Sequence, residues 1–142
     1  MVDNEETVDS LMDDPEIVEG FIAESKEYLY TIEDDFLNLE KQKDNPDPDL
    51  MGKVFRAIHS VKSATGFLGL SNMNRLALTM EKMLTLMRAG EIRPEPKYID
   101  PLLEGANLLT AMLDNVKQSS NVNITKVCDR LTGLLDKVKK GN

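Results

Sequence analysis

The sequence predicts an all-α protein, an antiparallel up-and-down four-helix bundle with an additional C-terminal fifth helix. Apolar residues recur at helical spacing in five segments of the 142-residue chain, which is long enough for one domain with one core. Most connectors between these segments are short and contain proline or glycine. Long helices joined by short connectors favour antiparallel packing. Aromatic residues make up only 5% of the chain, so leucine, methionine, isoleucine and valine must fill the core.

The first predicted helix spans residues 15–42, where apolar residues recur every three or four positions with one interruption at Ser25. Asp14 is a suitable N-cap, and Pro15 suits the first helical position. The segment DNPDPD, residues 44–49, contains two prolines and breaks the helix. We therefore expect one long helix before this break.

The second predicted helix runs from about residue 48 to 68, and Gly66 and Gly69 mark its end. Ser71 is a good N-cap for the third helix, which extends to about Ala89. Each of these helices has an apolar face and a polar face, so each is expected to pack one side against the core.

A fourth helix is predicted over about residues 97–118 and a fifth over about residues 123–140. Cys128 adjoins the apolar stripe of the fifth helix, and we expect it to be a packed small hydrophobe rather than a reactive thiol. The chain should thus comprise a flexible acidic N-terminus, the four-helix bundle, and a fifth helix leading into a linker (residues 1–13, 14–120 and 121–140).

Composition excludes several classes of protein. No run of about 18 apolar residues could cross a membrane, and the acidic N-terminus lacks the features of a secretory signal. The single cysteine cannot form an internal disulfide, which favours a reduced, cytoplasmic protein. The net charge of −8 argues against nucleic acid as a partner.

The charge is distributed unevenly along the chain. Residues 1–49 carry a balance of −14, whereas residues 50–142 carry +6. The bases in the middle of the chain either attract an acidic protein surface or a phosphate-bearing ligand, or simply balance the acidic first helix. These bases include Lys53, Arg56, Lys62, Arg75 and Lys82.

His59 is the only histidine in the chain. On a helix that turns 100° per residue, it falls roughly 160° from the centre of the apolar face, so it should point outward. Lys62 and Gly66 lie near it on the helical wheel, and Ser63 flanks it on the other side. Phe55 also falls on this outward side, where it either covers a neighbouring helix or forms part of a docking surface. A lone surface histidine is usually chemically idle.

Several chemistries lack the residues that they need. One histidine and one distant cysteine cannot supply a usual zinc site, and there are no Glu-x-x-His pairs for a di-iron site. There is no P-loop, and the glycines do not follow a strand. One chemistry does fit an exposed helical histidine, because imidazole is a good nucleophile toward a phosphoryl group.

Phosphoryl transfer requires one open ring nitrogen, an acceptor for the other nitrogen, a nearby cation and room for a partner. Lys62 supplies a cation and Gly66 supplies room. The candidate acceptor is Glu81, which lies at the edge of the apolar face of the third helix. The alternative for Glu81 is a solvated residue paired with Arg88 or Lys82.

The string HSVKSATGFLGL, residues 59–70, resembles the signature of histidine phosphotransfer (Hpt) domains, which is His-x-x-Lys-Gly followed by small residues and a glycine. More closely, it resembles the N-terminal phosphotransfer (P1) domain of CheA-type chemotaxis histidine kinases. The stretches FIAESKEYLYTIEDDFLNLE, MEKMLTLMRAGEIRP and YIDPLLEGANLLTAML resemble the helices and connector of that domain. The resemblance covers roughly residues 14–118.

The resemblance implies a phosphoryl carrier in two-component, chemotaxis-type signalling. His59 would accept the γ-phosphoryl group of ATP from a CheA-type kinase domain elsewhere in the same parent protein. It would then pass the group to an aspartate of a CheY- or CheB-type response regulator. Lys62 would steady the phosphoryl group, Gly66 would give clearance to a partner, and Glu81 would hold the inner nitrogen of His59. The domain itself would need no cofactor, because ATP binds to the separate kinase domain.

Two positions depart from the pattern of the family. Ser63 stands in place of the usual glycine after the lysine, where it either hydrogen-bonds the phosphate or crowds a docking partner. Leu78 stands where some relatives carry a second histidine. The isolated domain is expected to be a monomer, and a free-standing phosphotransfer protein is the alternative to a piece of a kinase. The alternative function is a helical docking or adaptor domain that binds a signalling partner without carrying phosphate.

Overall fold

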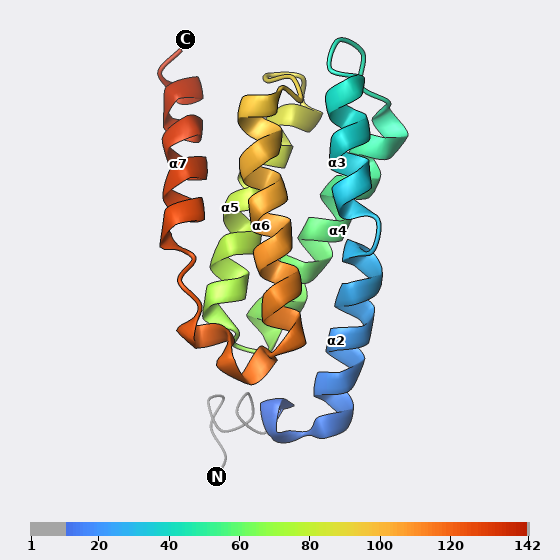
Figure 1. Ribbon diagram of the computed structural model, residues 1–142, viewed down its shortest axis with the longest axis vertical. Helices are drawn as coiled ribbons and strands as arrows, with labels where there is room; N and C mark the ends of the chain where they lie inside the picture. The colour runs from blue at the N-terminus through green and yellow to red at the C-terminus, as the bar shows by residue number, and fades with distance from the viewer. Residues whose placement is uncertain (1–10, 142) are drawn as a thin grey trace.

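The computed structural model describes residues 11–141. The flexible segment predicted for the N-terminus falls mainly on residues 1–10, which lie outside the described residues, whereas residues 11–13 are helical. The elements that follow are shown in Figure 1. They are α2 (Pro15–Leu29), α3 (Ile32–Lys41), α4 (Pro48–Phe67), α5 (Ser71–Arg88), α6 (Pro96–Asp114), the 3₁₀ segment η1 (Val116–Asn121) and α7 (Thr125–Lys139).

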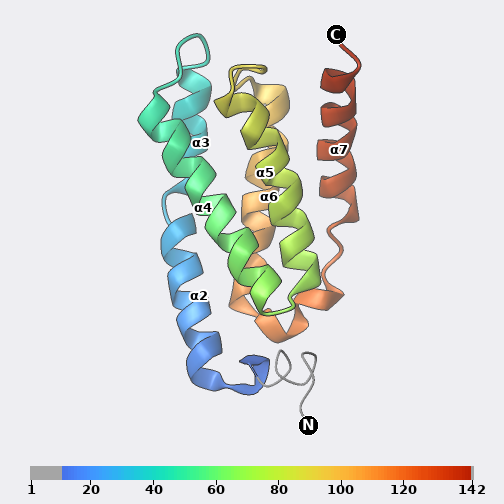
Figure 2. The same cartoon turned by 180° about the vertical axis from the view of Figure 1, so that it is seen from behind.

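The helices form a bundle in which α2 and α3 run in one direction and each later helix runs opposite to the one before it (Figure 1). Helices α2 and α3 follow one another along one corner and contact both α4 and α6, while α5 contacts α4 and α6 from the opposite corner. Helix α7 packs against α5 and α6, outside this group of four (Figures 1 and 2). The prediction of an up-and-down four-helix bundle with a fifth C-terminal helix is confirmed.

The single helix predicted for residues 15–42 is instead two helices, with a break at Tyr30 and Thr31. The amide of Tyr30 donates to the carbonyl of Glu27 at 3.3 Å, a three-residue rather than four-residue closure. Thr31 has φ −104° and ψ 5°, outside the helical range. The apolar stripe continues across the break to buried Ile32, so periodicity cannot reveal it.

The ends of the other helices follow their capping groups. The Asp14 side chain accepts a hydrogen bond from the amide of Glu16 at 3.0 Å, as predicted for an N-cap followed by Pro15. Helix α4 ends one residue before the predicted boundary. The prediction for Ser71 is wrong, since it is the first residue of α5 and Leu70 occupies the cap position.

The last two helices are shorter than predicted. Helix α6 ends at Asp114, and the chain continues as the 3₁₀ segment. Helix α7 begins at Thr125, whose amide donates to the side chain of Asn123 at 2.9 Å. Among residues 11–141, no helix is both long enough and apolar enough to cross a membrane.

The core lies between the four bundle helices and continues under α7. Helix α5 sits close to α6 because Gly105 leaves no side chain between them, and a Cβ there would come within 2.7 Å of the Met80 sulfur. Cys128 lies on the buried face of α7, and this burial raises the pKa of its thiol, which disfavours the reactive thiolate. The largest fully buried side chains are Phe36, Leu39, Ile58, Met73, Leu76, Met80, Met83, Leu84, Ile99, Leu102, Leu109 and Met112.

Candidate functional site

The site lies where the outward face of α4 meets α5, the two helices in front in Figure 2. His59 projects from α4 and its side chain is 52% exposed, as its place on the helical wheel predicts. Its Nδ1 lies 2.5 Å from Oε2 of Glu81 on α5. Because a carboxylate only accepts, this contact assigns the ring proton to Nδ1. In the neutral form of the ring, Nε2 then keeps its lone pair for a partner.

Lys62, one turn after His59 on α4, shares the same carboxylate. Its Nζ donates to Oε1 of Glu81 at 2.8 Å, so the two oxygens of Glu81 each hold one residue of α4. The Glu81 side chain is only 13% exposed. This burial raises the pKa of Glu81, but the hydrogen bonds and charges of Lys62 and His59 together outweigh it. The pKa of Glu81 is therefore lowered, and the carboxylate is ionised at neutral pH.

Gly66 leaves space for a residue that the sequence did not single out. The Asn74 side chain of α5 donates to the carbonyl of Lys62 at 2.8 Å, and a Cβ on Gly66 would come within 3.1 Å of the same Asn74 nitrogen. The Thr65 hydroxyl donates to this carbonyl as well, at 3.0 Å. The Asn74 bond joins α5 to α4 next to the site, whereas the Thr65 bond lies within α4, so Gly66 has a packing role in addition to any clearance for a partner.

The two positions that depart from the family pattern both lie at the surface. Ser63 is exposed on α4, and Leu78, one turn before Glu81 on α5, is 37% exposed. Neither side chain comes between His59 and Glu81, which are in direct contact. The absence of a second histidine at Leu78 thus leaves the His59–Glu81 contact intact.

Phe55 lies beside His59 on α4 and also contacts Arg88 of the neighbouring helix α5. Its ring lies nearly parallel to that of His59, with 5.9 Å between centroids and 13° between planes. The guanidinium carbon of Arg88, the last residue of α5, lies 3.7 Å from the centroid of the Phe55 ring. Sequence periodicity placed Phe55 beside His59 but gave no signal for Arg88, because that contact depends on how α4 and α5 align.

The five bases noted in the middle of the chain do not all surround His59. Lys53 lies 3.2 Å from Asp35 of α3, and Lys62 is bound to Glu81. Lys82 lines a groove that α5 shares with α7. The remaining two, Arg56 and Arg75, are exposed. The bases are thus divided among several sides of the bundle.

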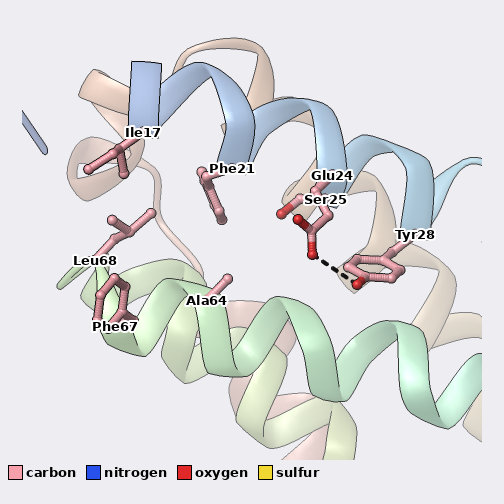
Figure 3. A pocket seen from close by; sticks show the side chains of 8 residues that line it. All are labelled: Ile17, Phe21, Glu24, Ser25, Tyr28, Ala64, Phe67 and Leu68. Carbon is pink, nitrogen blue, oxygen red and sulfur yellow. Dashed lines mark hydrogen bonds between the residues drawn. The ribbon is translucent and has the colours of Figure 1, made fainter. Parts of the chain in front are cut away.

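A shallow groove lies between α2 and α4, toward the C-terminal end of α4 (Figure 3). At one end Phe67 is 66% exposed, and at the other the Tyr28 hydroxyl donates to Glu24 at 2.9 Å, a bond that raises the pKa of Tyr28. The groove is lined by Ile17, Phe21, Glu24, Ser25, Tyr28, Ala64, Phe67 and Leu68. His59 and Glu81 do not line it, so the imidazole is presented on the surface rather than in this groove.

Within residues 11–141, no cluster of three or more histidine, cysteine, aspartate or glutamate residues could hold a metal ion. His59, Glu81 and Lys62 present a nucleophilic nitrogen at the surface, backed by a buried carboxylate and a cation.

Comparison with known protein families agrees with this geometry. Residues 16–119 match the model of the Hpt domain, which covers α4 and α5 and hence the whole site. The chain belongs to the Hpt domain family.

Relatives of this chain include CheA proteins of chemotaxis. The chain is 32% identical to the sensor histidine kinase CheAY of Helicobacter pylori over 78% of this chain and 14% of that protein. It is 28% identical to the chemotaxis protein CheA of Halobacterium salinarum over 89% of this chain and 19% of that protein. The chain therefore spans less than a fifth of the length of these relatives.

Two solved structures share the fold. The CheA phosphotransferase domain from Thermotoga maritima is 35% identical, with a TM-score of 0.65, over 71% of this chain and 94% of that one. The phosphorylated P1 domain of CheA3 from R. sphaeroides, solved in complex with CheY6, is 24% identical, with a TM-score of 0.71. That alignment covers 89% of this chain and 98% of the other, and it extends the similarity to nearly the whole described fold.

Proposed function

We propose that this domain is a phosphoryl carrier in chemotaxis-type two-component signalling and that His59 is its phosphorylation site. The observation that carries the proposal is the contact between Nδ1 of His59 and Glu81, which leaves Nε2 free on an exposed side chain. Membership of the Hpt domain family and similarity to CheA proteins support it.

The chemistry follows from the assigned tautomer. The Nε2 lone pair attacks the γ-phosphorus of ATP, the bond to the bridging oxygen breaks, and ADP leaves with that electron pair. The ring then carries a substituent on Nε2 and a proton on Nδ1, so it is cationic. Glu81 stabilises this cation while remaining ionised, and Lys62 both holds Glu81 and stands near the incoming phosphate charge.

In the second step the phosphoryl group passes from His59 to another protein. A carboxylate oxygen of an aspartate attacks the phosphorus, the N–P bond breaks, and its electron pair returns to Nε2. No proton has to move in either step, because Nδ1 keeps its proton against Glu81 throughout. Gly66 and Ser63 flank His59 on α4, where an approaching partner would pass over them.

The partners and location extend the same proposal. A CheA-type kinase domain donates the group and binds the ATP, and the domain itself holds no cofactor. A CheY-type regulator accepts the group, with a CheB-type regulator as the alternative acceptor. The domain acts in the cytoplasm as a monomeric module of a larger histidine kinase, serving as substrate and carrier rather than as catalyst.

Phosphate incorporation tests this function. The domain and His59→Gln are incubated with labelled ATP and a CheA-type kinase core, and thermal unfolding checks that both are folded. We expect acid-labile, base-stable label on the wild type, none on the variant, and transfer of the label to a CheY-type regulator. Label that persists on His59→Gln would place the chemistry at another residue. A folded wild type that stays unlabelled with competent kinase cores would favour the docking-domain function.

A further inference from the structure

The contact between Glu81 and His59 does not by itself fix the plane of the imidazole. The outer torsion of a histidine side chain is broad and roughly two-fold, so rotamer preference leaves the ring free to swing. One hydrogen bond at Nδ1 fixes the position of that edge but allows the ring to tilt about it. A nucleophile that must meet an in-line phosphorus needs its lone pair held in one direction.

The Phe55 ring supplies a flat surface beside this imidazole. It lies one turn before His59 on α4, with 5.9 Å between ring centroids and 13° between planes, which is within the range of offset-stacked aromatic pairs. Phe55 is half-buried and packs against the edge of the core, so its own position is constrained. A tilt of the imidazole out of its present plane would disturb this stacking.

Arg88 holds the Phe55 ring in turn. Its guanidinium carbon is 3.7 Å from the ring centroid, a close cation–π geometry. Arg88 is the last residue of α5, the helix that carries Glu81. Helix α5 therefore contacts the imidazole directly through Glu81, and indirectly through Arg88 and Phe55.

We propose that Phe55, held in place by Arg88, is a positioning residue that keeps the His59 imidazole oriented with Nδ1 on Glu81 and Nε2 open to the phosphoryl donor. The Phe55 side chain has no nucleophilic or acid–base group, so its role is to hold the imidazole rather than to react. The proposal deepens the proposed function, and its expected effect on the rate of phosphorylation rests on that function. Its expected effect on the tautomer of unphosphorylated His59 is independent of that function.

The test substitutes Phe55 and follows His59 directly. Phe55→Leu keeps apolar bulk but removes the plane, whereas Phe55→Tyr keeps the plane. Nitrogen NMR on the labelled domain, with the ring neutral, measures the fraction of His59 that carries its proton on Nδ1. Phosphorylation by a CheA-type kinase core gives the rate, and thermal unfolding gives the stability. Phe67→Leu is the matched control, because it makes the same change on the same helix away from His59, and it is compared by NMR and unfolding only.

We expect Phe55→Leu to lower the Nδ1-protonated fraction and to slow phosphorylation roughly threefold to tenfold, the range open to one aromatic pair. Phe55→Tyr should restore both, and Phe67→Leu should leave the NMR signals of His59 unchanged. If Phe55→Leu proves too unstable, Arg88→Met keeps Phe55 and should shift the same signals in the same direction by a smaller amount.

Other outcomes separate this proposal from the proposed function. A lower melting temperature with unchanged His59 signals and an unchanged rate would mean that Phe55 only packs, and would overturn the inference. A changed Nδ1 fraction in Phe55→Leu, in a domain whose wild type accepts no phosphate, would support the positioning role and refute the proposed function.

Discussion

Helix α4 takes part in two polar clusters on opposite sides, each built around one carboxylate of a neighbouring helix. On one side, Lys53 and Thr31 both contact the Asp35 carboxylate of α3, at 3.2 and 2.8 Å. On the other, Lys62 and His59 both contact the Glu81 carboxylate of α5, at 2.8 and 2.5 Å. The two carboxylate side chains are similarly buried, 11% and 13% exposed.

The difference lies in what the carboxylate holds. The Asp35 cluster contains an ammonium and a hydroxyl that bond to each other as well as to the carboxylate, with Lys53 donating to Thr31 at 2.9 Å. The Glu81 cluster contains an imidazole with a second nitrogen that faces outward. A lysine–carboxylate pair between helices therefore indicates only that the helices are joined. Reactivity also requires a side chain that keeps a nucleophilic atom free while another of its atoms is bound to the carboxylate.

The largest expected effect is on the rate of phosphorylation, when the charge of Glu81 is removed and the matched change at Asp35 serves as the comparison. Glu81→Gln should slow phosphorylation of His59 by about 10²-fold, because the amide neither enforces the Nδ1–H tautomer nor stabilises the cationic ring. Asp35→Asn, the matched change in the other cluster, should stay within about twofold of wild type, because Asp35 does not contact His59. Initial rates of label incorporation measure both. Equal losses in the two variants would show that the site depends on bundle stability alone.

A smaller effect, on the stability of the fold, is expected from a substitution in the Asp35 cluster. Asp35→Asn should lower the free energy of unfolding by about 1–3 kcal/mol, since a mostly buried carboxylate loses charge-assisted bonds from Thr31 and Lys53. Asp34→Asn, at the exposed neighbouring position, should change it by no more than about 0.5 kcal/mol. Urea unfolding of the three proteins gives the comparison. A neutral Asp35→Asn would mean that solvent replaces these bonds without loss.

The stability contributed by Glu81 should depend on pH in the acid range. Its pKa in the folded protein lies below the ordinary value of 4.5, so the stabilisation is present above that value and is lost as the pH falls through the folded pKa. The difference in unfolding free energy between wild type and Glu81→Gln should therefore shrink as the pH is lowered from about 5. Urea unfolding at a series of acid pH values measures it, and a difference that widened in acid would contradict the lowered pKa.

The smallest effect should come from Ser63. Ser63→Gly should cost about 0.5 kcal/mol through helix propensity and leave label incorporation within about twofold, because the side chain is exposed and stands apart from the His59–Glu81 contact. Ser63→Ala removes the hydroxyl while keeping a good helix former. Comparison of Ser63→Gly with Ser63→Ala therefore separates the effect on the backbone from the effect of the hydroxyl. A tenfold gain in transfer with both variants would show that Ser63 crowds the partner.

The sequence was sufficient for the helical bundle and for the outward direction of His59, because both depend on periodicity within single helices. It also selected Glu81 as a candidate, since one carboxylate flanks the apolar stripe of that helix. It could not provide Arg88 over Phe55, or Asn74 beside Gly66, because these contacts depend on the register between α4 and α5. The break at Thr31 was missed because no proline or glycine marks it.

The spacing of Lys53 and Lys62 has a mechanical consequence. They are nine residues apart on α4, which is two and a half turns and about 13.5 Å along the axis, so they lie on opposite sides of the helix. One is tied to α3 and the other to α5, so rolling α4 about its long axis would have to break or stretch both ties at once. The two ion pairs therefore restrict rotation of α4 about its axis. The direction in which His59 projects from the bundle is thus set by residues of two different helices, α3 and α5.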